Sequence, residues 1–278
     1  YNSFVTSYED SKREMQMYCE NKSEQLDQKM EKVEQSVDTV YSIATLKLTD
    51  VATFKKDKSY VDAYTEEMKD VLLEAASHTE GALTAYIRYN PEFTEPESGL
   101  FLTRNSSEEA FESVTPTDFS MYDSSDVEHV GWYYIPVQNK TATWMSPYYN
   151  ANIDVYMISY VIPIYVNDQS IGIIGMDIDY QELTDVVDAS NVFESGYAVL
   201  TDENGTILYH KDKEMGTELS AIVSNGNEFA SVLSDPQKEN TIFEYQMDGT
   251  DKSMCYSTLE NGMKYILTAP GRELRLEA

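Results

Sequence analysis

Aromatic side chains and one carboxylate dominate the segment from Gly131 to Tyr180. The rings lie in the runs GWYY from Gly131, WMSPYY from Trp144 and ISYVIPIY from Ile158. The segment ends in IGIIGMDIDY, where Asp177 stands within a nearly continuous apolar run. Rings that wall a pocket, together with one fixed charge, are what a protein uses to hold a small polar molecule. We therefore expect this segment to bind a ligand rather than to catalyse a reaction.

The candidate ligand-binding residues are Trp132, Tyr133, Tyr148 and Asp177. Asp177 is the strongest of them, because an acid on an apolar strand needs a partner if it is buried. The three aromatic residues have an alternative role as ordinary core, since large aromatic side chains are usually well buried. Asp179 lies two residues further along the same expected strand, nearer its end, where we expect solvent.

The charge of the chain is strongly acidic. Its 278 residues include 49 acidic and 20 basic ones, for a net charge of -29. Such a chain repels nucleic acid and anionic lipid surfaces, so we exclude both as partners. A hydrophobic content of 41% is ample for one large domain or two smaller ones.

No motif for catalysis or metal binding is present in the sequence. It contains no nucleophile elbow, no cluster with metal-ligand spacing and no phosphate-binding loop. Cys19 and Cys255 lie far apart in the chain, and we interpret both as small core hydrophobes. We therefore expect no enzyme activity, no catalytic residue, no metal and no cofactor. No apolar run is long enough to span a bilayer.

A change in composition divides the chain into a helical arm and a turn-rich body. The first glycine is Gly81 and the first proline is Pro91. Within the arm, apolar residues recur with heptad spacing at Leu26, Met30, Val33, Val37, Val40 and Ala44. We predict one helix over residues 3–48, roughly 70 Å long, and a second over 60–77. These six residues form an apolar seam along one side of the helix. The seam fits either a homodimer through the long helix or packing against the second helix.

The body reads as strands joined by hairpin turns. We expect strands at 83–89, 99–104, 132–136, 155–163 and 171–178, with a helix at 182–189. A second unit begins near Phe193, with strands at 196–200, 206–209, 241–246, 252–257 and 263–269 and a helix at 221–233. The predicted class is α+β, with two related antiparallel-sheet modules on one long helix. The predicted boundaries are 1–58 for the helix, 59–190 for the first module and 191–278 for the second.

Two stretches carry a resemblance to a known family. One runs from SPYY at Ser146 to Asp179, and the other is GYAVLTDENGTILYH, from Gly196 to His210. In this order they resemble a double Cache (dCache) sensor domain, with PAS-like modules that are membrane-distal and membrane-proximal. The resemblance implies the extracytoplasmic portion of a bacterial membrane receptor: a chemoreceptor, sensor histidine kinase or cyclic-dinucleotide enzyme. Transmembrane helices would then flank the sequence given, whose abrupt start at Tyr1 suggests a piece of a longer protein.

The family's amino-acid-binding pattern is matched only in part. Members have a Tyr, then an Arg five residues on, then Trp-Tyr, and later a Tyr and an Asp. Trp132 and Tyr133 resemble the central pair, and Tyr148 and Asp177 the later residues. In the family the Asp holds the ligand's amino group, and that half of the pattern is present here.

The carboxylate-holding half of the pattern is missing. Val130 stands at the Arg position, and Ser125 at that of the first Tyr. In the family the Arg grips the ligand carboxylate, which a guanidinium does well. The resemblance therefore favours an amine or a nucleobase-like ring in the distal module over an ordinary amino acid. Arg88 or Arg104 is an alternative source of the missing guanidinium.

Two other functions remain open from the sequence. The domain could read a partner protein without binding a small molecule, since many of its aromatic residues could simply pack a closed core. A free solute-binding protein is the other alternative, but its fold usually shows strand–helix–strand units in parallel sheets. Here hairpins dominate, which favours the sensor.

Overall fold

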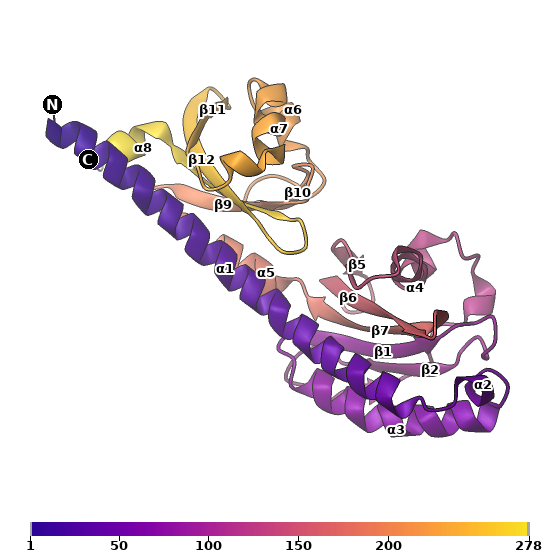
Figure 1. Cartoon of the computed structure of the whole chain (residues 1–278). Helices are drawn as coiled ribbons and strands as arrows, with labels where there is room; N and C mark the ends of the chain where they lie inside the picture. The colour runs from indigo at the N-terminus through magenta and orange to yellow at the C-terminus, as the bar shows by residue number, and fades with distance from the viewer. Residues whose placement is uncertain (1, 277–278) are drawn as a thin grey trace. The chain divides into compact units, whose positions relative to one another are not determined.

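A computed structural model describes residues 2–276, and the side chains of residues 7–275 (Figure 1). The chain divides into two compact units. Unit 1 comprises Tyr1–Lys29 and Gln181–Ala278, and unit 2 comprises Met30–Tyr180. Each unit is an antiparallel sheet with helices on its faces, so the predicted α+β class is confirmed. Among the described residues, no helix has the length and apolarity needed to cross a bilayer.

The long helix α1 covers Asn2–Lys47, as the heptad pattern predicted. Its seam residues are all buried within the single chain: Leu26, Met30, Val33, Val37, Val40 and Ala44. In unit 2 the helix packs beside α3 (Lys58–Ser77), whose Tyr64 hydroxyl donates a 2.6 Å hydrogen bond to the Ala44 carbonyl. The seam is therefore covered by its own chain, which is the intramolecular alternative.

Unit 2 holds a sheet with the strand order β3-β2-β1-β7-β6-β4, and β5 also pairs with β6. Its strands are β1 (Ala82–Tyr89), β2 (Gly99–Thr103), β3 (Glu112–Ser113), β4 (Thr143–Trp144), β5 (Tyr148–Asn150), β6 (Val155–Val166) and β7 (Gln169–Asp179). The short elements α2 (Val51–Phe54) and η1 (Phe119–Met121) complete it together with α3 and α4 (Val127–Asn139). Figure 1 shows α3 along one face of the sheet and α4 over the other.

The β6–β7 hairpin confirms a turn that the sequence predicted. Asn167 and Asp168 both have positive φ, at 50° and 62°, a conformation that Asn and Asp tolerate better than most residues. Ser159 lies opposite Asp177 in this hairpin, and a register shift between Ile164 and Tyr165 separates that pair from the turn. The turn and this shift together set which side chains of the two strands lie opposite each other.

The predicted strand over residues 132–136 is wrong, because this segment lies in helix α4. Asp126 caps the helix by accepting a hydrogen bond from the His129 amide at 3.2 Å. Buried residues then recur at Val130, Tyr133 and Pro136, a helical spacing. The aromatic run favours a strand by propensity alone, but this cap and this periodicity outweigh it.

Unit 1 holds a sheet with the order β10-β9-β13-β12-β11, and β8 pairs with β9. Its strands are β8 (Asn191–Val192), β9 (Gly196–Thr201), β10 (Ile207–Tyr209), β11 (Phe243–Met247), β12 (Thr250–Thr258) and β13 (Lys264–Pro270). Its helices, besides the start of α1, are α5 (Gln181–Asp188), α6 (Leu219–Ile222), α7 (Gly226–Ser234), η2 (Pro236–Lys238) and α8 (Gly271–Leu276). The five strands predicted for this unit are confirmed. Both cysteines are buried, and neither forms a disulfide.

The single helix predicted over residues 221–233 is instead two helices, α6 and α7. Asn225 breaks them with a φ of 58°, in the left-handed region. Gly226 follows, where a Cβ atom would lie 1.9 Å from the Ser220 carbonyl oxygen. The chain therefore turns sharply at a place where only glycine fits.

A matched pair of leucines on α1 tests whether the seam is packed within the chain. Leu26 is 0% exposed and Leu46 is 79% exposed. We expect Leu26→Ala to lower the free energy of unfolding by about 2–5 kcal/mol, because it removes buried apolar area and leaves a cavity. We expect Leu46→Ala to change it by less than about 0.5 kcal/mol. Urea unfolding measures both. If Leu26→Ala lowers the free energy of unfolding at high protein concentration but not at low concentration, the seam is instead an interface between two copies of the chain.

Candidate functional site

The candidate site of unit 2 is built around Asp177 of β7, whose side chain is 5% exposed. Asp177 is paired in register with Thr84 of β1 on one side and with Ser159 of β6 on the other. Residues opposite each other in a sheet point to the same face. The Thr84 hydroxyl therefore donates to Oδ2 of Asp177, and the Ser159 hydroxyl to Oδ1 at 2.6 Å.

Two tyrosine hydroxyls complete the surroundings of the carboxylate. Tyr86 donates to Oδ1 of Asp177 at 3.0 Å. Tyr148 of β5 also makes a hydrogen bond with Asp177, and its oxygen lies 3.5 Å from that of Ser159. The Tyr148 residue is 39% exposed, so its buried hydroxyl end reaches Asp177 from a ring that touches solvent. Tyr148 is thus the most exposed of the four residues around the carboxylate, since Thr84, Tyr86 and Ser159 are buried.

The carboxylate has hydroxyl partners but no cation. Among the residues whose side chains are described, no lysine, arginine or histidine forms an ion pair with Asp177. Burial raises the pKa of Asp177 above its ordinary value, and the four hydroxyl hydrogen bonds act in the opposite direction. A buried anion with neutral partners is stabilised further by a positive charge placed against it. The arrangement therefore suits an ammonium group.

Aromatic rings form a wall next to the carboxylate. The Tyr86 ring stacks on Phe101 at 5.8 Å between centroids and meets the edge of Trp132 at 5.4 Å. Trp132 in turn stacks on Phe119 at 5.7 Å. Tyr86 can lie flat against the sheet because Gly175 faces it: a Cβ atom there would lie 2.6 Å from the ring. Gly175 is therefore a glycine of close approach within β7 rather than of a turn.

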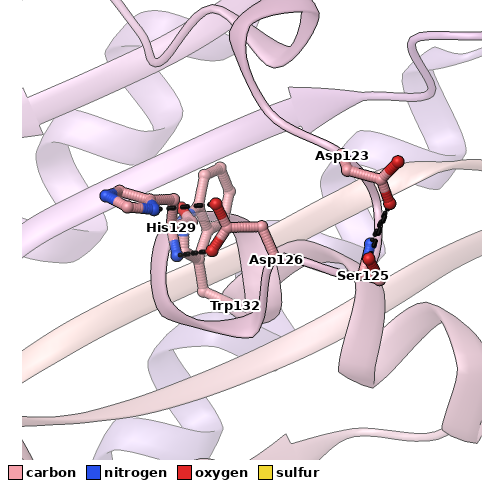
Figure 2. A network of polar contacts seen from close by, with 5 residues as sticks. All are labelled: Asp123, Ser125, Asp126, His129 and Trp132. Carbon is pink, nitrogen blue, oxygen red and sulfur yellow. Dashed lines mark hydrogen bonds and ion pairs between the residues drawn. The ribbon is translucent and has the colours of Figure 1, made fainter.

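The start of α4 holds Trp132 in place (Figure 2). The indole Nε1 donates to the His129 carbonyl at 2.8 Å, and Nδ1 of His129 lies 2.9 Å from Oδ2 of Asp126. Just before the helix, Asp123 accepts hydrogen bonds from the amide and hydroxyl of Ser125. Because the indole N–H already donates to the His129 carbonyl, a ligand here would meet the ring of Trp132 rather than its N–H.

Tyr133 lies deeper than its neighbour Trp132. It is 2% exposed and packs with Phe119 at 4.9 Å between ring centroids. Its buried hydroxyl has no hydrogen-bond partner among the described residues. Successive residues on a helix point about 100° apart, so the pair cannot face the site together. The structure brings Trp132, Tyr148 and Asp177 around Tyr86 and puts Tyr133 in the core behind them.

Arg88 and Arg104 were the two candidates to replace the family arginine that is missing at Val130. Arg88 points to the same face of the sheet as Asp177. Thr84, Tyr86 and Arg88 alternate along β1 and point to one side. Arg88 is 0% exposed, its guanidinium lies 4.4 Å from the Phe119 ring centroid, and burial lowers its pKa to about 10. Three hydrogen bonds go to the backbone carbonyls of Pro96, Ser98 and Thr117. Its Nη1 atom is buried and has no partner among the described residues.

Arg104 lies on the opposite face of the sheet. Its Nε donates to the Ala82 carbonyl at 2.7 Å, and Nη1 to the carbonyl of Ser107 at 3.2 Å. The guanidinium lies over the ring of Phe111. Arg104 therefore stabilises a loop, and Arg88 is the arginine of the pair that is near the site.

Sequence reasoning missed three residues that contact Asp177: Thr84, Tyr86 and Ser159. The signal available was the alternation of Thr84, Tyr86 and Arg88 in a strand that otherwise reads as apolar. Their meeting with Asp177 depends on strand pairing between distant segments, which one sequence does not reveal. Among the described residues, no group of three or more His, Cys, Asp or Glu could hold a metal ion.

Comparison with known proteins decides the family. The Cache domain profile matches residues 4–277, nearly the whole chain. The chain belongs to the Cache domain family. The predicted double Cache architecture is thereby confirmed, with its long helix and PAS-like modules.

Sensor domains are among the relatives of this Cache domain. It is 26% identical over 147 residues to the methyl-accepting chemotaxis protein McpG of Pseudomonas putida, covering 53% of this chain and 22% of McpG. The chain thus spans about a fifth of that relative's length. The sensory domain of the Campylobacter jejuni chemoreceptor Tlp3 has a similar fold, with a TM-score of 0.68, 15% identity and 98% of each chain covered.

Two further solved structures share the fold. The Tlp3 ligand-binding domain in complex with L-norvaline gives a TM-score of 0.65 at 15% identity, covering 97% of this chain and 94% of that one. The extracellular domain mmHK1S-Z3, assigned to a histidine kinase, gives a TM-score of 0.70 at 17% identity. The match covers 97% of this chain and 96% of that one. At these identities the likeness establishes the fold alone.

Asp177→Asn tests whether the carboxylate serves binding rather than folding. Because its pKa is raised, the folded chain holds the Asp177 proton more tightly than the unfolded chain does. Ionisation therefore costs stability as the pH rises through the folded-state pKa. We expect the variant to be at least as stable as the parent at about pH 7, and this difference to shrink toward about pH 4. Urea unfolding at both pH values measures it.

A double-mutant cycle with Thr84→Val provides the control. In the parent, loss of the Thr84 hydroxyl should destabilise the ionised carboxylate by about 1–3 kcal/mol at neutral pH. In the Asp177→Asn background the same change should cost less, because the charge is gone. A melting temperature that falls by several degrees in Asp177→Asn alone would contradict the binding role and make the residue a structural centre of the sheet.

Proposed function

We propose that this Cache domain is the extracytoplasmic sensor portion of a bacterial membrane receptor, and that unit 2 binds a small amine-bearing molecule. The observation that carries the proposal is Asp177, a buried carboxylate with hydroxyl partners and no counter-ion among the described side chains. An ammonium has three donors and a full charge, so it can replace hydroxyl hydrogen bonds and neutralise the carboxylate at once. A nucleobase-like ring that donates N–H groups to Asp177 is the related alternative.

The surroundings of Asp177 support a ligand with an apolar body. Trp132 and Tyr86 present rings beside the carboxylate, and Tyr148 lies at the exposed side. The relatives support the sensor role: McpG is a chemotaxis protein, and the Tlp3 domain has been solved with L-norvaline. The ligand would act by binding two conformations of the domain unequally, because only such a difference can shift a population.

A second function, recognition of a partner protein, is favoured by one surface feature. Tyr149 and Tyr156 are 48% and 43% exposed, and their rings lie 5.2 Å apart. Tyr148, also partly exposed, adjoins them on the same strand pair. Exposed tyrosines of this kind are typical of protein interfaces. The antiparallel sheets of both units argue against a free solute-binding protein with parallel strand–helix units.

A thermal-shift screen of the 278-residue chain tests the proposed function. The library comprises biogenic amines, nucleobases, amino acids and small carboxylates. A ligand present at about a hundred times its dissociation constant stabilises the folded state by roughly 2.7 kcal/mol, which such a screen detects. We expect hits among the amines, lost in Asp177→Ala and weakened at least tenfold in Trp132→Ala. Tyr149→Phe, which alters an exposed ring outside the site, should retain them.

The Arg88 side chain provides a separate arm of the same screen. An amino acid is compared with the amine that lacks its carboxyl group, in the parent and in Arg88→Lys. If the two ligands bind alike, the carboxyl group is not recognised, as the amine proposal expects. If the amino acid binds more than tenfold tighter only when Arg88 is present, Nη1 of Arg88 holds the carboxylate, and the ligand is an amino acid. Hits restricted to carboxylates and retained in Asp177→Ala would contradict the proposal, and a silent library would favour the partner protein.

A further inference from the structure

The sheet of unit 1 has a polar end on the face that α7 covers elsewhere. On this face, Tyr197 of β9 pairs with Thr268 of β13, and Lys252 of β12 pairs with Tyr245 of β11. Further along the same strands, Val199, Met254 and Ile266 belong to the apolar cluster that packs against α7. Packing against α7 accounts for the apolar residues at one end of this face. It does not account for the lysine that is buried at the other end.

Lys252 is a buried cation without an acidic partner. It is 8% exposed, and its Nζ donates one hydrogen bond, to the Tyr197 hydroxyl at 3.0 Å. Among the described side chains, no carboxylate lies within ion-pair distance of it. Asp248, one of the acids in its neighbourhood, instead pairs with Lys213 at 3.5 Å. A buried ammonium is costly unless an anion accompanies it.

A second ammonium lies on the same tyrosine ring. Nζ of Lys211 lies 4.2 Å from the centroid of Tyr197, and Nζ of Lys252 lies 4.8 Å from it. Two like charges on one ring repel each other, and the chain as a whole carries 49 acidic residues against 20 basic ones. Asp212 and Asp248 lie in the same neighbourhood, but among the described side chains neither forms an ion pair with Lys211 or Lys252. The two ammonium groups are therefore available to an anion.

Hydrogen bonding leaves the proton of the Tyr197 hydroxyl available. His210 accepts the amide protons of Asp212 and Lys213 on Nδ1, at 2.9 and 3.1 Å, so its own proton is on Nε2. Nε2 lies 3.4 Å from the Tyr197 oxygen, which also accepts from Lys252. The oxygen thus receives two donors, and its own proton has no acceptor among the described residues. A ligand oxygen would supply one.

Aromatic side chains border the polar end. Phe243 and Tyr245 stack with an interplanar angle of 2°, and Phe229 meets Tyr245 at 5.2 Å. Phe243, Tyr245 and Lys252 line a cavity of about 320 Å³, within the range of small-ligand sites. Arg275 and the acids Glu228, Glu244 and Asp251 also line it, whereas Tyr197 and Lys211 are not among its lining residues. A short apolar body fits beside these rings, whereas a bare inorganic anion would leave them in contact with water.

We propose that the polar end of unit 1 binds a small carboxylate anion, whose oxygens accept hydrogen bonds from Nζ of Lys252 and the hydroxyl of Tyr197. Lys211 contributes positive charge from the ring face, and the Phe243 and Tyr245 rings contact the short hydrocarbon part. This second site is independent of the Asp177 site in unit 2. It binds a ligand of the opposite charge, and its test does not depend on whether the proposed function of unit 2 is correct.

Calorimetric titration of the whole chain with sodium propionate tests this site, and propionamide is the uncharged control. We expect propionate to bind and propionamide not to bind, at constant ionic strength in chloride. Lys252→Met keeps the length of the side chain and should weaken propionate binding at least tenfold. Tyr197→Phe keeps the ring and removes the donor, and should weaken it about tenfold, as expected for a hydrogen bond to a charged group. Tyr149→Phe, which alters an exposed ring of unit 2 outside both sites, should leave it unchanged.

Several results would overturn the second site. Equal affinity for propionate in the parent and in Lys252→Met would do so, as would equal binding of propionamide. Binding of inorganic phosphate without propionate would overturn the carboxylate assignment. If Lys252→Met does not fold, Tyr197→Phe decides instead, and unchanged propionate binding there contradicts the proposal. Absence of any propionate heat in the parent also contradicts it.

Discussion

The burial of Asp177 without a counter-ion is the constraint on which unit 2 depends. An ionised carboxylate loses its water on burial, and hydroxyl hydrogen bonds restore only part of that loss. The sheet meets this cost by converging hydroxyls from three other strands: Thr84 and Tyr86 of β1, Tyr148 of β5 and Ser159 of β6. Folding therefore requires the register of these strands, and the remaining electrostatic cost is what a cationic ligand can relieve. A group that merely stabilised the fold would be better replaced by an apolar residue.

The aromatic wall follows from the same arrangement. Tyr86 reaches Asp177 only because Gly175 lets its ring lie close to β7, and this position brings it against Trp132. Trp132 in turn depends on the cap of α4, since Asp126 holds the first turn and His129 holds the indole. A chain of contacts thus joins a helix start to a carboxylate on the sheet. Movement of α4 is a physically direct way for an occupied site to be sensed elsewhere in unit 2.

The fold was predictable wherever local patterns decided it. The heptad spacing predicted the long helix, and the Asn167–Asp168 turn predicted the β6–β7 hairpin. The register of that hairpin also depends on a shift between Ile164 and Tyr165, which the sequence did not reveal. The α4 segment was not predictable from propensity, because its aromatic run favours a strand and its Asp126 cap is a short-range signal that is easily overlooked. The need of Asp177 for polar partners was predictable, because an acid there interrupts an apolar strand. Thr84, Tyr86 and Ser159 were not, because hydroxyl side chains are common and only long-range strand pairing brings them together.

The two units place opposite charges on their sheet faces: a carboxylate with hydroxyl donors in unit 2, and ammonium groups around a tyrosine hydroxyl in unit 1. The net charge of -29 acts on both in different ways. A field of this sign raises the local concentration of cations and speeds their arrival, which would favour the proposed amine ligand of Asp177. An anion approaches against the same field, which falls off over about 8 Å at physiological ionic strength. A site for it must therefore supply positive charge at short range, and in the proposed site this charge would come from Lys252 and Lys211, which both lie over the Tyr197 ring.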